Sequence, residues 1–140
     1  MTITCGTNIA NSGDNWAIAA YNSGSQNSIL SIIGNGAFNL NGTRLLGSSA
    51  LGQQGIHTAT KQSATVSKLF KNGVQKISGN SGGTLPTSPF YIGAIGNISY
   101  GYISERIQFT AIHEGLSDAE VATLHTIIDT FEAALGRKTW

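Results

Sequence analysis

Short apolar runs of strand length alternate with polar, glycine-rich turns along most of the chain. Such runs recur roughly every 8 to 12 residues between Asn15 and Ile112, which is the spacing of an antiparallel β-sandwich or barrel. Several runs alternate apolar and polar residues, as half-buried strands do. The predicted strands are 16–21, 29–33, 37–40, 56–60, 66–71, 74–77, 90–95 and about 102–112.

Two turns between these strands have a clear sequence signature. Asn72-Gly73 separates two predicted strands, and this pair favours a two-residue type I′ hairpin because both residues tolerate positive φ angles. Gly34-Asn35-Gly36 predicts a second tight turn, for the same reason. Residues 78–89 contain several glycines and both prolines of the chain, so we expect a surface loop there.

The end of the chain changes from strand to helix periodicity. Ser117 and Glu120 form a capping box, in which each side chain bonds the other residue's backbone N–H. We predict a helix over about 117–135, ended by Gly136 in the left-handed conformation. This helix would pack on a sheet face or against another copy of the chain. Its apolar positions recur at three- and four-residue spacing and form one stripe: Val121, Leu124, Ile128, Phe131 and Leu135.

These elements predict one domain over residues 1–140, an all-β antiparallel sandwich closed by one C-terminal amphipathic α-helix. Charged residues make up only 11% of the chain and the net charge is +1, so we expect no nucleic-acid partner. No apolar run approaches the roughly 18 residues that span a bilayer, and the polar start lacks a signal core. We therefore expect neither membrane insertion nor a signal peptide. Cys5 is the single cysteine, so packing must stabilise the domain.

Three segments of the chain resemble the laminin-G-like, concanavalin A-like jelly roll. In that family a His-bearing strand, a hairpin with an Asn-Gly tip and a Tyr-Ile-Gly strand follow in this order. The resemblance implies a jelly-roll β-sandwich. Such domains usually need somewhat more residues for two full sheets, which leaves open a strand from a neighbouring subunit or a longer parent chain. The segments are Gly55-Ile56-His57-Thr58-Ala59-Thr60, Leu69-Phe70-Lys71-Asn72-Gly73-Val74 and Pro89-Phe90-Tyr91-Ile92-Gly93-Ala94.

The tail of the chain resembles the end of such domains in tailed-phage and prophage structural proteins. The resemblance covers residues 107–112, 115–122 and 134–137. It implies a tail-fibre or capsid-surface module on a virion or extracellular particle, made in the host cytoplasm. Such a module would assemble with copies of itself or with other virion proteins and would bind a host-surface glycan. The alternative is a stand-alone, lectin-like carbohydrate-binding module of a larger protein.

Catalysis is not predicted. Enzymatic members of the family carry a Glu-x-Asp-x-x-Glu strand, and no segment here matches it. Glycoside hydrolysis needs two carboxylates about 5–10 Å apart. Glu105 and Glu114 would lie roughly 30 Å apart on one extended strand. A glucanase-like hydrolase is therefore the least favoured alternative, and we assign no catalytic residue.

No metal site is predicted either. His57, His113 and His125 lack the spacing of a zinc site. Calcium is the one cofactor left open, because Asp14 and Asn97 offer the oxygen ligands that this cation prefers.

Two aromatic pairs are candidate sugar-binding sites, because a sugar needs an aromatic face and polar partners for its hydroxyl groups. Tyr100 and Tyr102 lie near Asn97, and Trp16 with Tyr21 forms the second pair. The competing interpretation is that one member of each pair packs into the core.

Two aromatic residues near the end of the chain are candidate subunit contacts. They are Phe131 on the predicted helix and Trp140 at the end of the sequence. For Trp140 the alternative is packing against the end of the helix.

Overall fold

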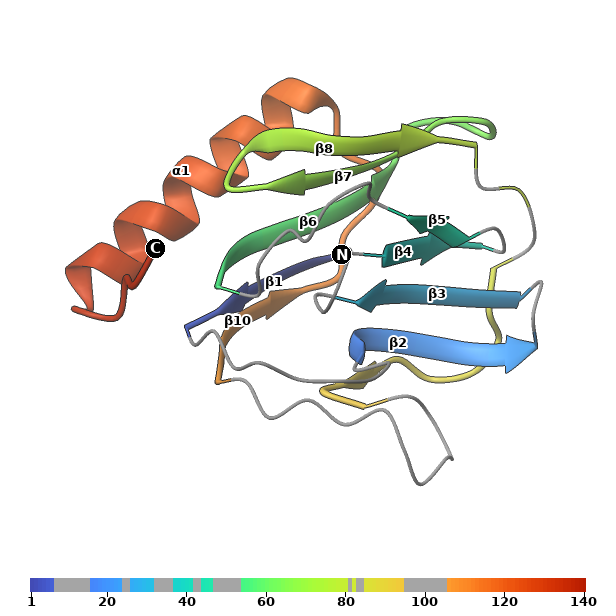
Figure 1. Cartoon of the computed structure of the whole chain (residues 1–140), viewed down its shortest axis with the longest axis horizontal. Coiled ribbons are helices and arrows are strands. Elements are labelled where there is room, and N and C mark those ends of the chain that lie inside the picture. Colours follow the sequence, from blue (N-terminus) through green and yellow to red (C-terminus); the bar gives the residue numbers. More distant parts are fainter. Residues whose placement is uncertain are drawn as a thin grey trace.

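Two antiparallel sheets and one helix make up the fold in the computed structural model (Figure 1). It describes residues 1–6, 16–23, 26–31, 37–41, 44–46, 54–80, 82, 85–94 and 106–140. Within these residues, the first sheet has the order β10-β1-β6-β7-β8 and the second the order β5-β4-β3-β2-β9. The strands are β1 (Thr2–Cys5), β2 (Trp16–Ser23), β3 (Gln26–Ser31), β4 (Ala37–Leu40), β5 (Arg44–Leu46), β6 (Gly55–Lys61), β7 (Ser67–Lys71), β8 (Val74–Gly79), β9 (Tyr91–Ile92) and β10 (Ile107–Ala111).

The hydrophobic core lies between the two sheets. Every second residue of a strand faces the same side, and one side of each sheet supplies this core. The first sheet contributes Ile3, Cys5, Ala59, Leu69 and Ile77, and the second contributes Ala17, Ile18, Leu30, Phe38 and Leu40. The predicted β-rich sandwich with one C-terminal helix is confirmed at this level.

Strand β1 is a central strand of the first sheet that the sequence pattern did not predict. It pairs antiparallel with both β10 and β6. Ile3 and Cys5 face the core, while Thr2 and Thr4 are also fully buried. Threonine has high β-propensity but is usually exposed. The alternation of threonine with apolar residues therefore indicated a polar start of the chain and not a buried strand. Strand β5 was not predicted either.

The Asn72-Gly73 hairpin is confirmed. Asn72 has φ 50° and Gly73 has φ 75°, and they join β7 to β8. Strand β9 is shorter than the predicted 90–95, because Gly93 adopts φ 76° immediately after it. Strand β10 begins only at Ile107. The predicted turn at 34–36 and residues 102–105 lie outside the described part of the chain.

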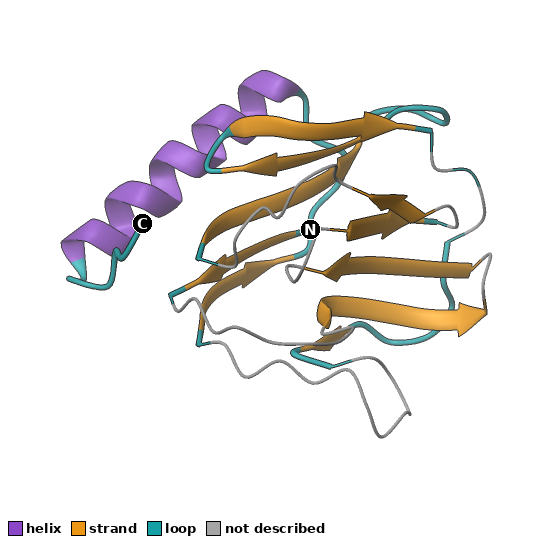
Figure 2. Ribbon diagram, in the orientation of Figure 1, coloured by secondary structure: helices purple, strands orange, loops and turns teal. Residues whose placement is uncertain are grey.

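The C-terminal helix α1 (Asp118–Ala134) begins at the predicted capping box and is followed by Gly136 at φ 66°. It lies beside the first sheet, away from the second (Figures 1 and 2). Its apolar stripe divides into two parts. Val121 and Ile128 are buried, whereas Phe131 and Leu135 are half exposed. No helix among the described residues is long and apolar enough to cross a membrane.

Candidate functional site

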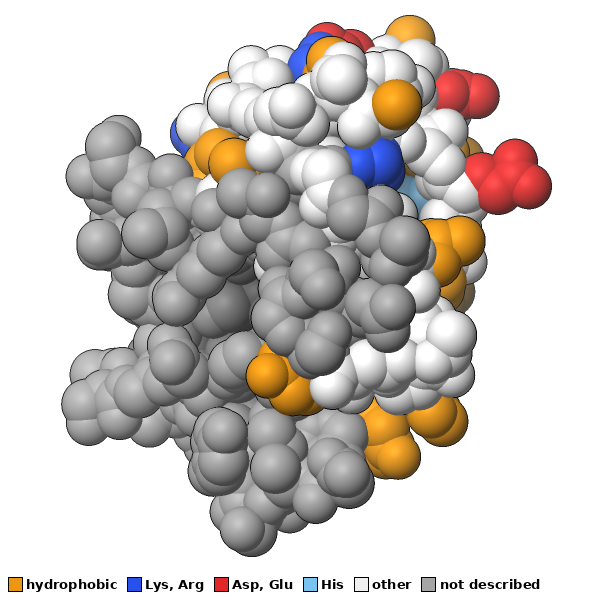
Figure 3. Space-filling view, turned by 90° about the vertical axis from the view of Figure 1, so that its right-hand side faces the viewer, with side chains coloured by type: hydrophobic (Ala, Val, Ile, Leu, Met, Phe, Trp, Pro, Cys, Tyr) orange, Lys and Arg blue, Asp and Glu red, His pale blue; other side chains and the backbone are white. Residues whose placement is uncertain are grey.

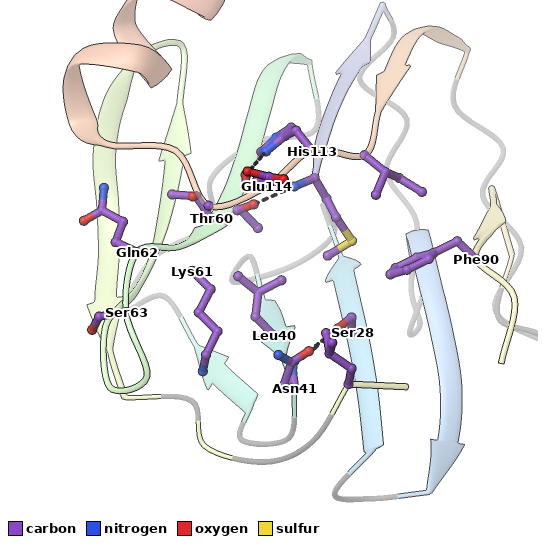
Figure 4. A pocket seen from close by; sticks show the side chains of 15 residues that line it. Ser28, Leu40, Asn41, Thr60, Lys61, Gln62, Ser63, Phe90, His113 and Glu114 are labelled. Atoms are coloured by element: carbon purple, nitrogen blue, oxygen red, sulfur yellow. Dashed lines mark hydrogen bonds between the residues drawn. The ribbon is translucent and has the colours of Figure 1, made fainter. Parts of the chain in front are cut away.

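A pocket of about 540 Å³ opens between the two sheets near the start of the chain (Figure 4). Pockets that hold small ligands usually measure roughly 300–1,000 Å³. The described lining residues come from six separate segments: Met1; Ser28; Leu40 and Asn41; Ala59, Thr60, Lys61, Gln62 and Ser63; Leu85 and Phe90; and Ile112, His113, Glu114 and Gly115.

Main-chain pairing fixes the inner wall of the pocket. The Met1 nitrogen donates a 2.8 Å hydrogen bond to the Ala59 carbonyl, and the Ala59 N–H donates to the Met1 carbonyl at the same distance. Met1, Leu40 and Ala59 also belong to the hydrophobic core. The apolar wall of the pocket is therefore continuous with the core and held as rigidly as the sheet.

Exposed apolar side chains stand at the mouth of the pocket. Leu85 is 73% exposed, Ile112 54% and Phe90 37%. A group of exposed large apolar side chains around a cavity is a feature of ligand and partner sites. Figure 4 shows Phe90 on one side of the pocket and Lys61 on the other.

Polar groups face the same cavity from β3, β4 and β6. The Ser28 hydroxyl donates to Oδ1 of Asn41 at 3.0 Å, and Asn41 has φ 62° directly after β4. This geometry directs the amide of Asn41 toward the pocket. Lys61 ends β6 and lies on the same face as Ala59. Its side chain runs along the pocket toward Asn41 (Figure 4).

The side chains of His113, Thr2 and Thr58 form a hydrogen-bonded chain beside the pocket. Nδ1 of His113 lies 2.7 Å from the Glu114 carbonyl oxygen. Since a carbonyl only accepts, Nδ1 carries the hydrogen and Nε2 of the neutral ring accepts from the Thr2 hydroxyl at 3.0 Å. The Thr2 hydroxyl also lies 3.0 Å from that of Thr58.

The electrostatics favour a neutral His113. Burial lowers the pKa of its imidazole, and the nearby amino group of Met1 lowers it further where that group is protonated, while the Glu114 carbonyl partly opposes this shift. The ring is therefore uncharged at pH 7. Among the side chains of the described lining residues, Lys61 supplies one positive charge and Glu114 one negative charge.

The chemistry of the lining can be compared with what catalysis and binding require. The hydroxyl, imidazole and carbonyl groups follow the order of a nucleophilic triad, but Thr2 has no exposed surface for a substrate to reach. Glu114 is the only carboxylate among the described lining residues, and glycoside hydrolysis needs a pair. The pocket offers hydrogen bonds, one aromatic ring and apolar contact.

Among the sequence-predicted sugar residues, only Tyr21 has a side chain that the structure describes. Asn97, Tyr100 and Tyr102 lie outside the described residues. Tyr21 is 38% exposed on β2 and is not among the described lining residues. Trp16 begins the same strand, and its side chain is outside the described part.

The two predicted subunit contacts lie at the helix. Trp140 is partly buried and donates from Nε1 to Oδ1 of Asp129 at 3.2 Å, so it packs at the helix end. Phe131 is 50% exposed, and the Arg137 guanidinium stands 5.7 Å from the centre of its ring.

Sequence reasoning missed the residues that line the pocket. Phe90 carried a usable signal, because it follows a proline at the end of a predicted loop. Asn41, Lys61 and Glu114 carried none, since only the sheet topology brings them together. His113, considered from the sequence only as a metal ligand, is half buried and bonds to Thr2 and Glu114.

Metal ligation has no candidate in the described part of the chain. No group of three or more His, Cys, Asp or Glu residues there could hold an ion. The calcium ligands considered from the sequence, Asp14 and Asn97, fall outside it.

In comparisons with known proteins, no family, no curated protein and no solved structure matches the chain.

Proposed function

We propose that the chain is a non-catalytic binding module that holds part of a surface glycan in the pocket between its sheets. The observation that carries this proposal is the placement of Phe90 across one cavity from the polar Lys61 (Figure 4), with Asn41 and Glu114 also lining the cavity. A sugar ring has apolar C–H faces and a polar hydroxyl edge, and this pocket provides a partner for each.

Other ligand classes fit the lining less well. A purely apolar ligand would take the polar groups of the lining, such as the Glu114 carboxylate, out of water without replacing their hydrogen bonds, at a cost in free energy. A nucleic acid would need a strongly basic surface, and the described atoms of the face in Figure 3 carry only scattered basic and acidic side chains. The opposite charges of Lys61 and Glu114 favour a ligand that is close to neutral and rich in hydroxyl groups.

We also propose the finer identity that the sequence resemblance implies. The sandwich is a concanavalin A-like jelly roll, the chain is a virion or prophage structural component, and it assembles with copies of itself. The pairing of the first described strand, β1, with the last, β10, supports the jelly roll, and the tail motifs support the particle. A lectin-like module of a larger protein is the alternative, and it would use the same pocket.

A glycan array tests the proposal with three proteins: the unaltered chain, Phe90→Ala and Tyr91→Ala. Tyr91 is the matched control, because it is the neighbouring exposed aromatic residue, at 40% exposure, and is absent from the described lining. We expect the unaltered chain and Tyr91→Ala to bind the same glycans and Phe90→Ala to lose roughly tenfold or more in affinity. Equal binding by all three, or none by the unaltered chain, would overturn the pocket proposal.

A further inference from the structure

The polar side chains around the pocket differ in the bonding capacity that they keep for a ligand. Glu114 is exposed, and among the described residues its carboxylate has no hydrogen-bond or ion-pair partner. A carboxylate offers two acceptor oxygens, so this side chain can accept from two neighbouring hydroxyl groups of a sugar. Several other polar side chains of the lining already bond within the chain: Ser28, Thr60, Gln62, Ser63 and His113.

Asn41 keeps a hydrogen-bond donor for a ligand. Its backbone N–H donates to the Ser28 hydroxyl at 3.4 Å, and that hydroxyl donates to Oδ1 of Asn41 at 3.0 Å. In this arrangement Oδ1 is occupied, and the two hydrogens of Nδ2 have no partner among the described residues. Figure 4 shows the nitrogen of Asn41 turned away from Ser28. The amide can therefore donate to an oxygen of a sugar.

Asn41 and Glu114 lie on opposite sides of the cavity. Asn41 directly follows β4 in the second sheet. Glu114 lies beside β6 of the first sheet, because the nearby Leu116 N–H donates to the Thr60 hydroxyl at 2.6 Å. Figure 4 shows the two residues at opposite ends of the pocket, with Leu40 between them. A donor therefore lies at one end and an acceptor at the other.

The middle of the cavity is apolar. Leu40 belongs to the hydrophobic core, and the Phe90 ring points into the cavity from the side (Figure 4). An aromatic ring packs well against the C–H face of a sugar, because both surfaces are flat and apolar. The order along the cavity is thus a donor, an apolar section and an acceptor.

The size of the cavity exceeds what one sugar residue fills. A hexose displaces about as much volume as six waters, or roughly 180 Å³, whereas the cavity measures about 540 Å³. A single sugar on the Phe90 ring would leave much of the cavity, including one or both polar ends, in contact with water. A short chain of linked sugars fills the same volume and reaches both ends.

We propose that the pocket binds an oligosaccharide of about two to three sugar residues, whose ends are recognised by Asn41 and Glu114. The Asn41 amide donates to the sugar at one end. The Glu114 carboxylate accepts from hydroxyl groups of the sugar at the other end, and Phe90 packs against the section between them. This inference rests on the proposed glycan binding, and it adds the length of the ligand and the residues that contact its ends.

Chain length is tested with fragments of one to four sugar residues from the glycan that binds most strongly on the array. Calorimetric titration of the unaltered chain measures each affinity, with free glucose as the probe for unspecific sugar binding. We expect the Kd to fall roughly tenfold or more between one residue and three, and to change little at four. Equal affinities for one and three residues would overturn this inference and leave glycan binding intact. An array without any bound glycan would overturn both.

Three variants test the two ends. Asn41→Asp keeps the oxygen that Ser28 contacts and removes the donor, and Glu114→Gln removes the charge and one acceptor. Asn80→Asp is the matched control, because Asn80 is exposed and absent from the described lining. The three-residue fragment should lose roughly tenfold in affinity for each pocket variant and none for the control, while the one-residue fragment should change little.

The same titrations can contradict the assignment of the two ends. An unchanged affinity of the three-residue fragment for either pocket variant would show that this residue does not contact the oligosaccharide. Equal losses for the one-residue and three-residue fragments would show that the substitutions disturb the whole pocket and not its ends. Either result would overturn the two-ended site.

Discussion

Nη2 of Arg137 lies 2.8 Å from Oε1 of Glu132, a carboxylate with no exposed surface. A second bond joins Nε of Arg137 to Oε2 at 2.9 Å, so the pair is bidentate. A glutamate on a helix is usually exposed to solvent. Glu132 instead occupies the buried side of α1, and the chain beyond the helix folds back to neutralise it.

We predict that Arg137→Ala destabilises the domain by about 3 kcal/mol, because it leaves a buried charge without its partner. Lys138→Ala is the matched control, since Lys138 pairs with the partly exposed Asp129 and such pairs contribute under about 1 kcal/mol. Urea denaturation of the two variants measures the difference. Equal losses would mean that Glu132 does not depend on Arg137.

We predict that Gly115→Ala distorts one wall of the pocket. A Cβ atom at Gly115 would lie 2.0 Å from the backbone oxygen of Lys61, whereas one at Gly82 would meet nothing within 4 Å. The segment cannot easily move away, because the Leu116 N–H donates to the Thr60 hydroxyl at 2.6 Å.

The expected loss of stability for Gly115→Ala is about 1–3 kcal/mol, the usual cost of overpacking, with weaker glycan binding. Gly82→Ala should change neither quantity. Thermal denaturation and calorimetric titration of both variants provide the measurements. A Gly115→Ala protein that is as stable as the unaltered chain would show that the two segments are not in close contact.

We predict that stability falls as the pH drops from 8 to 5. Burial lowers the pKa of the Met1 amino group from 8.0 to about 5. The unfolded chain therefore binds a proton in this range that the folded chain does not, so unfolding is favoured as the pH falls. A three-unit shift corresponds to roughly 4 kcal/mol. The lowered pKa of His113 acts in the same direction below its ordinary value of 6.5.

Denaturant titrations between pH 5 and 9 measure this slope, once mass spectrometry has established that Met1 is retained. An Nα-acetylated chain is the control, because it keeps an N–H donor and has no ionisable amine. Its profile should be flatter and should retain the contributions of His113 and His125, whose pKa values burial also lowers. Superimposable profiles would show that the amine is not buried as the bond to Ala59 requires.

Local sequence signals predicted the elements that depend on few residues. Asn72-Gly73 and the Ser117–Glu120 capping box are set by backbone chemistry within four positions, and both are confirmed. Strand β1 was missed because its burial depends on β6 and β10, which pair with it from distant parts of the chain. Thr2 and Thr4, on the other face of this strand, are also buried. Their burial depends on distant parts of the chain, which the pattern within a short segment does not encode.

The pocket could not be predicted for the same reason. Phe90, Lys61 and Glu114 are far apart in sequence, and each alone is an ordinary loop or strand-end residue. The aromatic pairs singled out from the sequence rested on neighbours along the chain, whereas a site between two sheets is assembled from strand ends. The helix was predicted more completely than the pocket. Its stripe was predicted, but which residues face the sheet was not.

The most direct test of the account is amide chemical-shift mapping of the unaltered chain with the glycan that binds most strongly on the array. The account predicts saturable shifts concentrated at the pocket, in Asn41, Lys61, Phe90 and residues 112–115, with Tyr91→Ala behaving in the same way. Shifts centred on Tyr100 and Tyr102 or on Tyr21, with the pocket silent, would contradict it and return the sugar site to the loops.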